Sequence, residues 1–133
     1  IKPDGTKRFF FFFLVKGVCS LLGSITAGKP LYVCEGWATG ATIHADTGAA
    51  VACTMNAGNL LAVGQRLQRQ HPDAVLIVAG DDDRLTESNP GKTAAINAAA
   101  TLGCGLVLPP WTGAEPLTLT DFNDLRQWRE TQQ

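Results

Sequence analysis

The sequence predicts an α/β fold, a three-layer sandwich around a mainly parallel central sheet. Short apolar runs that favour strands alternate along the chain with longer segments of helical spacing, and this alternation is typical of parallel strand pairing. Two of the runs, residues 31–34 and 74–79, lead directly into acidic residues. With 133 residues, of which 45% are hydrophobic and 17% charged, the chain is long enough for one domain with a substantial core.

The first part of the chain predicts an antiparallel pair of strands that precedes the main sheet. Residues 8–15 and 17–22 are apolar and adjoin at a Lys-Gly turn. Residues 9–13 are all Phe, so in a strand their rings would alternate between the two faces. We expect residues 1–29 to form a β-hairpin and linker that lead into a domain of residues 30–133.

Strands and helices then alternate to the end of the chain. The expected strands cover residues 31–34, 49–54, 74–79 and 104–108. The expected helices cover residues 36–46, 59–70, 90–102 and 120–130. The first helix is rich in small residues that permit close packing, and the second has Leu and Val at helical spacing after a cap at Asn56 or Asn59. Pro90 fits the first turn of the third helix, and Pro109 ends the last strand.

Composition argues against several classes of protein. The net charge of −1 gives no overall basic field, which disfavours tight nucleic-acid binding by this domain alone, although Lys2, Lys7, Arg8 and Lys16 cluster near the start. The four cysteines contain no C-x-x-C pair, so we expect no zinc ribbon, but reduced thiols and a cytoplasmic protein. The Phe-rich run is too short to span a bilayer, and the chain, which starts without Met, is expected to be a piece of a longer protein.

Acidic residues follow two of the expected strands. Asp81, Asp82 and Asp83 come at the end of one strand, and Glu35 comes at the end of another. In open parallel sheets the ligand site lies at the carboxyl ends of the strands, and carboxylate oxygens suit Mg²⁺ or Mn²⁺. Any one of these residues alone is explained as well by a solvated loop or a helix cap. The combination of Glu35 with Asp81 and Asp83 predicts a metal site.

A later polar cluster lies at the start of the last expected helix. Asp121 and Asp124 follow the strand of residues 104–108 and can return to the same edge of the sheet. Either residue is then a candidate metal ligand or a group that supports the ligands. The plainer alternative is that Thr120 or Asp121 only caps the helix.

Other polar residues give weaker signals. Lys92 stands at a Gly-Lys-Thr helix start, but a phosphate-binding P-loop would need Gly at the position of Thr86. The helix start and Lys92 remain candidates for phosphate contact, with a plain helix start as the equal alternative. His44 and His71 lack any ligand at a suitable spacing, and Tyr32 lies inside a strand, where covalent tyrosyl chemistry is disfavoured.

Several segments in a fixed order point to a known family. The strings EGWATGATIH, MNAGNL, AGDDD, a Gly-Lys helix start and DFNDL follow one another between residues 30 and 128. This order resembles the Toprim domain, the acidic catalytic fold shared by bacterial-type primases, type IA and II topoisomerases, OLD-family nucleases and recombination-mediator proteins. It is most similar to the Toprim domains of plasmid, phage and conjugative-element primases.

The resemblance implies a Toprim-like, Rossmann-like sandwich and roles for particular residues. Glu35 would act as general base or metal ligand, and Asp81 and Asp83 would hold Mg²⁺ or Mn²⁺. Asp82 would point the other way. Many replicative primases carry another acid four residues after the Glu, where this chain has Thr39, so a ligand would have to come from the cluster at the last helix.

The resemblance also implies a function. We expect metal-dependent nucleotidyl transfer in a primase that makes RNA primers on single-stranded DNA from nucleoside triphosphates, together with other domains of a longer chain, such as a zinc-binding, helicase or relaxase domain. Two alternatives remain at this point. One is an OLD-like Toprim nuclease that uses the same acids, and the other is a non-catalytic module that binds DNA or a partner.

Overall fold

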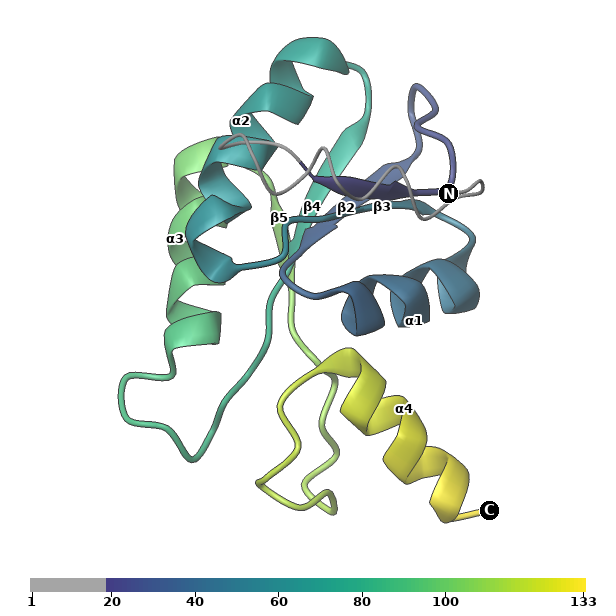
Figure 1. Ribbon diagram of the computed structural model, residues 1–133, viewed down its shortest axis with the longest axis vertical. Coiled ribbons are helices and arrows are strands. Elements are labelled where there is room, and N and C mark those ends of the chain that lie inside the picture. Colours follow the sequence, from purple (N-terminus) through teal and green to yellow (C-terminus); the bar gives the residue numbers. More distant parts are fainter. Residues whose placement is uncertain (1–18) are drawn as a thin grey trace, which may run out of the picture.

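The computed structural model describes residues 19–133 and shows a single mixed sheet with helices on both faces (Figure 1). The strands are β1 (Ser20–Leu22), β2 (Pro30–Cys34), β3 (Ala50–Cys53), β4 (Val75–Ala79) and β5 (Gly105–Val107). The helices are α1 (Trp37–Thr47), α2 (Leu60–Gln70), α3 (Pro90–Leu102) and α4 (Phe122–Thr131), with a short 3₁₀ helix, η2 (Ala57–Asn59), before α2.

The strand order confirms the predicted fold class. The sheet runs β1-β3-β2-β4-β5, and every neighbouring pair is parallel except β1 with β3. The strand expected at residues 17–22 is present as β1, whereas residues 8–15, the clustered early basic residues and most of the leading segment lie outside the described residues. Because β1 pairs with β3, the end of the leading segment is attached to the edge of the domain sheet.

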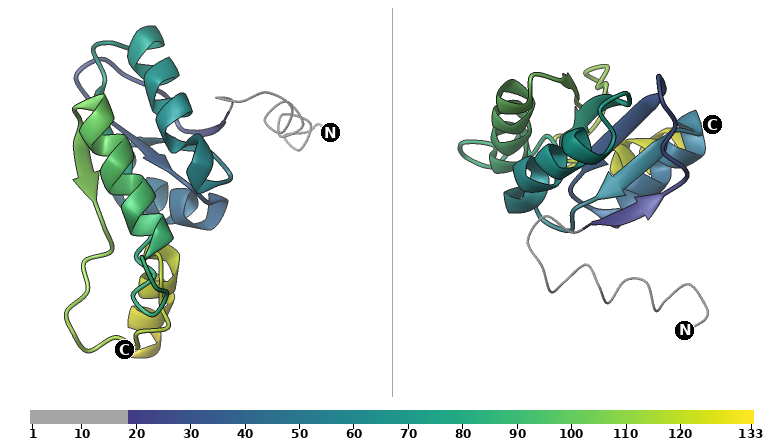
Figure 2. Two further views of the ribbon diagram at one scale, coloured as in Figure 1. Left: turned by 90° about the vertical axis from the view of Figure 1, so that its left-hand side faces the viewer. Right: turned by 90° about the horizontal axis from the view of Figure 1, so that it is seen from above.

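Helices α2 and α3 cover one face of the sheet and α1 covers the other, which gives the three layers (Figure 2). Alternation along the strands matches these layers. Toward α2 and α3 the sheet presents Leu31, Val33, Ala50, Ala52, Leu76 and Val78. Toward α1 it presents Cys34, Val51, Cys53 and Ala79. Helix α4 packs on α1 near the end of the sheet at which the parallel strands finish (Figure 1).

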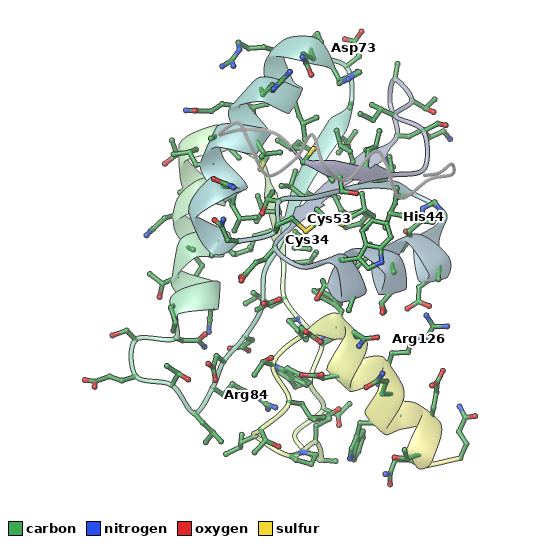
Figure 3. The ribbon with its side chains drawn as sticks, in the orientation of Figure 1. Cys34, His44, Cys53, Asp73, Arg84 and Arg126 are labelled. Atoms are coloured by element: carbon green, nitrogen blue, oxygen red, sulfur yellow. The ribbon has the colours of Figure 1, made fainter. Side chains whose placement is uncertain are left out.

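The contact between α1 and the sheet is close because Gly40 faces two cysteines. Cys34 and Cys53 are opposite each other on β2 and β3, and their sulfur atoms lie 3.8 Å apart (Figure 3). A Cβ atom at Gly40 would overlap the sulfur of Cys53. The small residues of α1 therefore allow this helix to lie directly against β2, the strand that precedes Glu35.

A few boundaries and caps differ from the sequence prediction. Neither Asn56 nor Asn59 caps α2 through its side chain, because η2 forms the entry to that helix instead. The last helix begins at Phe122, since Asp121 has extended backbone and accepts a cap hydrogen bond.

All four cysteines are free, and burial raises the pKa of the Cys19 thiol to about 11. No helix within residues 19–133 has the length and apolar character needed to cross a bilayer.

Candidate metal centre

Glu35 and Asp81 lie at the same edge of the sheet because β2 and β4 are neighbours. These strands are parallel, and their register places Cys34 opposite Ala79. Glu35 follows Cys34 directly, and Asp81 follows Ala79 after one glycine. The carbonyl of Glu35 also accepts a hydrogen bond of 2.6 Å from the amide of Met55, which fixes the turn after β2 against the turn after β3.

Asp81 is the most perturbed acid of this edge. Burial raises the pKa of Asp81 to about 7, and the negative charges of the nearby Glu35, Asp121, Asp124 and Asp83 add to that effect. Its Oδ1 atom is buried and has no hydrogen-bond partner. A carboxylate in this setting favours either a proton or a cation.

Asp121 and Asp124 come to the same place from the first turn of α4. Asp121 caps the helix by accepting a hydrogen bond of 2.7 Å from the amide of Asp124. Burial is the main cause that raises the pKa of Asp121, while the side chain of Thr39 hydrogen-bonds to it and works in the opposite direction. One turn farther along α1, the hydroxyl of Thr42 donates to Asn123 at 3.2 Å. The two threonines of α1 therefore hold the start of α4.

The members of the acidic triplet have different surroundings. Asp83 accepts a short hydrogen bond from the hydroxyl of Thr86, and its amide donates to Asn89 Oδ1 at 2.8 Å. Asp82 is only 7% exposed, and its carboxylate accepts hydrogen bonds from Asn89 and Trp111. Asp81 thus has an unpaired oxygen, whereas both oxygens of Asp82 are occupied.

Lys92 lies on the first turn of α3, beside the acids. A Cβ atom at the preceding Gly91 would stand 3.0 Å from the Cβ of Asp81, so the start of α3 packs closely on that residue. The backbone amide of Lys92 is directed at Asn89 Oδ1 at 3.4 Å. Because this amide is already used, the ammonium group is the part of Lys92 that can contact a phosphate.

The donor set of this edge suits a hard divalent cation, although it does not form a closed cage. The available ligands are carboxylate oxygens, and the unpaired Oδ1 of Asp81 is among them. Within residues 19–133 no group of three or more His, Cys, Asp or Glu side chains is gathered tightly enough to hold a metal ion. Mg²⁺ retains several waters and is usually bound through one or two carboxylates, so an open edge is compatible with it.

Two hollows in the described part of the chain lie away from the acids. One of about 500 Å³ is at the amino ends of the strands, between the last turns of α2 and α3. Another of about 530 Å³ lies between α1, α4 and the end of β5. None of the five candidate carboxylates lines either hollow.

Sequence reasoning missed several residues that shape this edge. The sequence pattern gave no role to Asn89, Trp111 or Thr42, and at Thr39 it indicated only the lack of a charge. The signal for Asn89 was its place directly before Pro90, where a helix cap is favoured. No local signal marked Trp111, because its partner is 29 residues away in the chain.

The family is shown by comparison with known proteins. The Toprim domain family matches residues 30–131. The chain belongs to the Toprim family. Two relatives from Escherichia coli, each named DNA primase TraC, are 36% identical to the chain in an alignment of 122 residues that covers 86% of the chain. The chain spans only 12% of one relative and 8% of the other. No solved structure matches the chain at a significant level.

Proposed function

We propose that this Toprim domain is the catalytic domain of a plasmid- or phage-type DNA primase. In this proposal it transfers nucleotides from nucleoside triphosphates to make RNA primers on single-stranded DNA, with Mg²⁺ or Mn²⁺ as cofactor. The observation that carries the proposal is the setting of Asp81, whose unpaired Oδ1 lies among the charges of four other acids. The names of the Escherichia coli relatives support primer synthesis as the use of such a site.

Each acid has a role in the proposal. Asp81 and Asp83 would hold the cation together with Glu35, Asp121 and Asp124. A divalent cation bound there would neutralise the charge that develops on the attacking hydroxyl and on the departing pyrophosphate. Glu35 would also accept the proton of the primer 3′-hydroxyl. The hydrogen bond from the amide of Met55 to the carbonyl of Glu35 holds the backbone of Glu35 at the sheet edge.

Lys92 would contact the phosphates of the incoming nucleotide. Its position on the first turn of α3, next to Asp81, supports this role because the amino end of a helix favours anions. Asp81 must lose its proton before it can bind a cation, and with a pKa of about 7 this proton is released near neutral pH.

The proposal includes other domains of a longer chain. Residues 30–133 would form the catalytic domain, and residues 1–29 would lead into it. Template binding would depend on further domains, such as a zinc-binding, helicase or relaxase domain, because the net charge of this chain is −1. The free cysteines support a reducing compartment such as the cytoplasm.

Two parallel assays on the full-length gene product test the proposal. One contains single-stranded DNA and labelled ribonucleotides, and the other contains labelled DNA alone. We expect Mg²⁺-dependent primers from the wild type and from Asp73→Asn, an exposed carboxylate far from the site (Figure 3), but none from Glu35→Gln or Asp81→Asn. Cleavage of the labelled DNA that Asp81→Asn abolishes would instead identify a nuclease. Full primer synthesis by Asp81→Asn would overturn the proposal.

A further inference from the structure

We propose that Asp82 is a positioning residue that holds the acids of α4 against Asp81 without itself binding the metal. This inference rests on the proposed metal-dependent function. It assigns a role to the member of the acidic triplet whose carboxylate has no free oxygen for a cation.

Both oxygens of the Asp82 carboxylate are used within the protein. Oδ1 accepts a hydrogen bond of 2.6 Å from Nδ2 of Asn89, and Oδ2 accepts one of 3.0 Å from Nε1 of Trp111. The side chain is 7% exposed, so these bonds compete little with water. Hydrogen bonds to a buried charged group are stronger than those between neutral groups, and their loss would leave the carboxylate unsatisfied.

The backbone of Asp82 connects the triplet to α4. Its amide donates to the carbonyl of Thr120 at 2.7 Å. The amide and hydroxyl of Thr120 donate to Oδ2 of Asp124 at 2.9 and 3.3 Å. Asp121 follows Thr120 directly in the chain. Asp82 is thus one backbone hydrogen bond away from Thr120, the residue that precedes Asp121 and bonds to Asp124.

Two further residues, Arg84 and Asn89, brace this connection. The guanidinium group of Arg84 lies 3.9 Å from the centre of the Trp111 ring and donates to the carbonyl of Pro116 at 2.9 Å, so it bridges the triplet loop and the segment before α4 (Figure 3). On the other side, Asn89 has left-handed backbone, with φ 42°, and its Oδ1 also accepts the amide of Asp83. The hydrogen bonds of the Asn89 side chain to Asp82 and Asp83 compensate for this less favoured backbone conformation.

The negative charges of the site explain why such a connection is needed. Asp81, Asp121 and Asp124 repel one another when no cation is present, and their loops would separate if nothing held them. The bonds through Asp82 keep these carboxylates close before a cation arrives. Loss of the bonds should therefore weaken metal binding even where the charge of the site is unchanged.

Three variants and Mn²⁺ alone as the probe test this role. Asp82→Asn replaces one accepting oxygen with an NH₂ group, which then faces the N–H donor of either Asn89 or Trp111. Trp111→Phe removes the indole N–H together with the five-membered ring, and it leaves a six-membered aromatic ring and the net charge in place. Glu115→Gln is the matched control. Glu115 is a buried carboxylate of the same segment, 4% exposed, and it bonds to the amides of Thr112 and Gly113, not to Asp82.

Mn²⁺ affinity is measured by electron paramagnetic resonance, and amide hydrogen exchange is followed at Asp82 and Thr120. We expect the dissociation constant to rise about 10-fold in Asp82→Asn and in Trp111→Phe, since groups behind metal ligands typically have effects of that size. Exchange at Asp82 should accelerate in both variants. Glu115→Gln should keep the wild-type affinity within a factor of about two, which would show that loss of a buried charge in this segment is not the cause.

The outcomes separate the positioning role from the proposed function. Wild-type affinity in Trp111→Phe would overturn the role of Asp82, even if Asp82→Asn failed to fold. Equal weakening in Glu115→Gln would also overturn it, because general loosening of the segment would then explain the effect. An absence of saturable Mn²⁺ binding by the wild type would overturn the metal-dependent function itself.

Discussion

Replacing Asp81 with Asn should stabilise the metal-free protein while abolishing its binding of divalent cations. The substitution keeps the shape of the side chain but removes a charge that lies among four others. In the folded protein this charge is disfavoured by burial and by its neighbours, whereas in the unfolded chain it is solvated. A neutral amide at the same place carries a much smaller desolvation penalty.

The size of the effect follows from the pKa of Asp81, which is about 7 in the folded protein against an ordinary value of 3.8. At about pH 8 this difference corresponds to an upper bound of about 4 kcal/mol in the free energy of unfolding. The carboxyl group is partly exposed, and solvent screening reduces the expected gain to about 2 kcal/mol.

The gain depends on pH in a defined direction. Between about pH 4 and pH 7 the unfolded chain releases the Asp81 proton before the folded protein does, so wild-type stability falls as the pH rises through this window. Below about pH 4 both states hold the proton, and the advantage of Asp81→Asn disappears. Urea unfolding in metal-free buffer near pH 8 and near pH 3, with Asp73→Asn as the control, measures both limits.

Added Mg²⁺ should reverse the order of stability. At about one hundred times its dissociation constant a bound cation stabilises the wild type by about 2.7 kcal/mol, which exceeds the advantage of about 2 kcal/mol of Asp81→Asn, and that variant should gain nothing. If Asp81→Asn were no more stable than the wild type near pH 8 without metal, the electrostatic reasoning would be refuted. If Mg²⁺ stabilised both proteins equally, Asp81 would not be a ligand.

Other substitutions test further parts of the structure. Thr39→Val should raise the pKa of Asp121 and weaken Mn²⁺ binding several-fold, while Thr39→Ser should restore both; a nuclear magnetic resonance titration of Asp121 checks the first, and unchanged affinity in Thr39→Val would contradict the contact. Gly40→Ala should destabilise the protein by about 1–3 kcal/mol in urea unfolding, because the added methyl group overlaps Cys53, and an unchanged midpoint would contradict this packing. Lys92→Gln should raise the KM for nucleoside triphosphates several-fold with little change in kcat, and an unchanged KM would exclude the proposed phosphate contact.

The features that could be predicted from the sequence depend on local pattern. Strand β4 and helix α3 were expected within one residue of their observed limits, because one is a short β-branched run and the other starts at a proline. Glu35 directly follows β2, and Asp81 follows β4 after one glycine, so their closeness required only that these parallel strands be neighbours. The sequence left two alternatives for Asp121 and Asp124, a return to the same edge after β5 or a helix cap alone.

The features that could not be predicted depend on contacts across irregular segments. The residues between β5 and α4 have no periodic pattern, so nothing in the sequence indicated that Trp111 would bond to Asp82. Thr39 stands where an acid was expected, and its side chain lowers the pKa of Asp121. In both cases a distant partner, and not the residue type, determines the role.

Anomalous scattering from a crystal of the protein soaked in Mn²⁺ tests the central claim most directly. The account predicts a manganese peak at the carboxyl ends of β2 and β4, within coordinating distance of Asp81 and next to Glu35. The peak should be absent from Asp81→Asn crystals grown and soaked in the same way. A fully occupied manganese site elsewhere, with no density beside Asp81, would contradict the account.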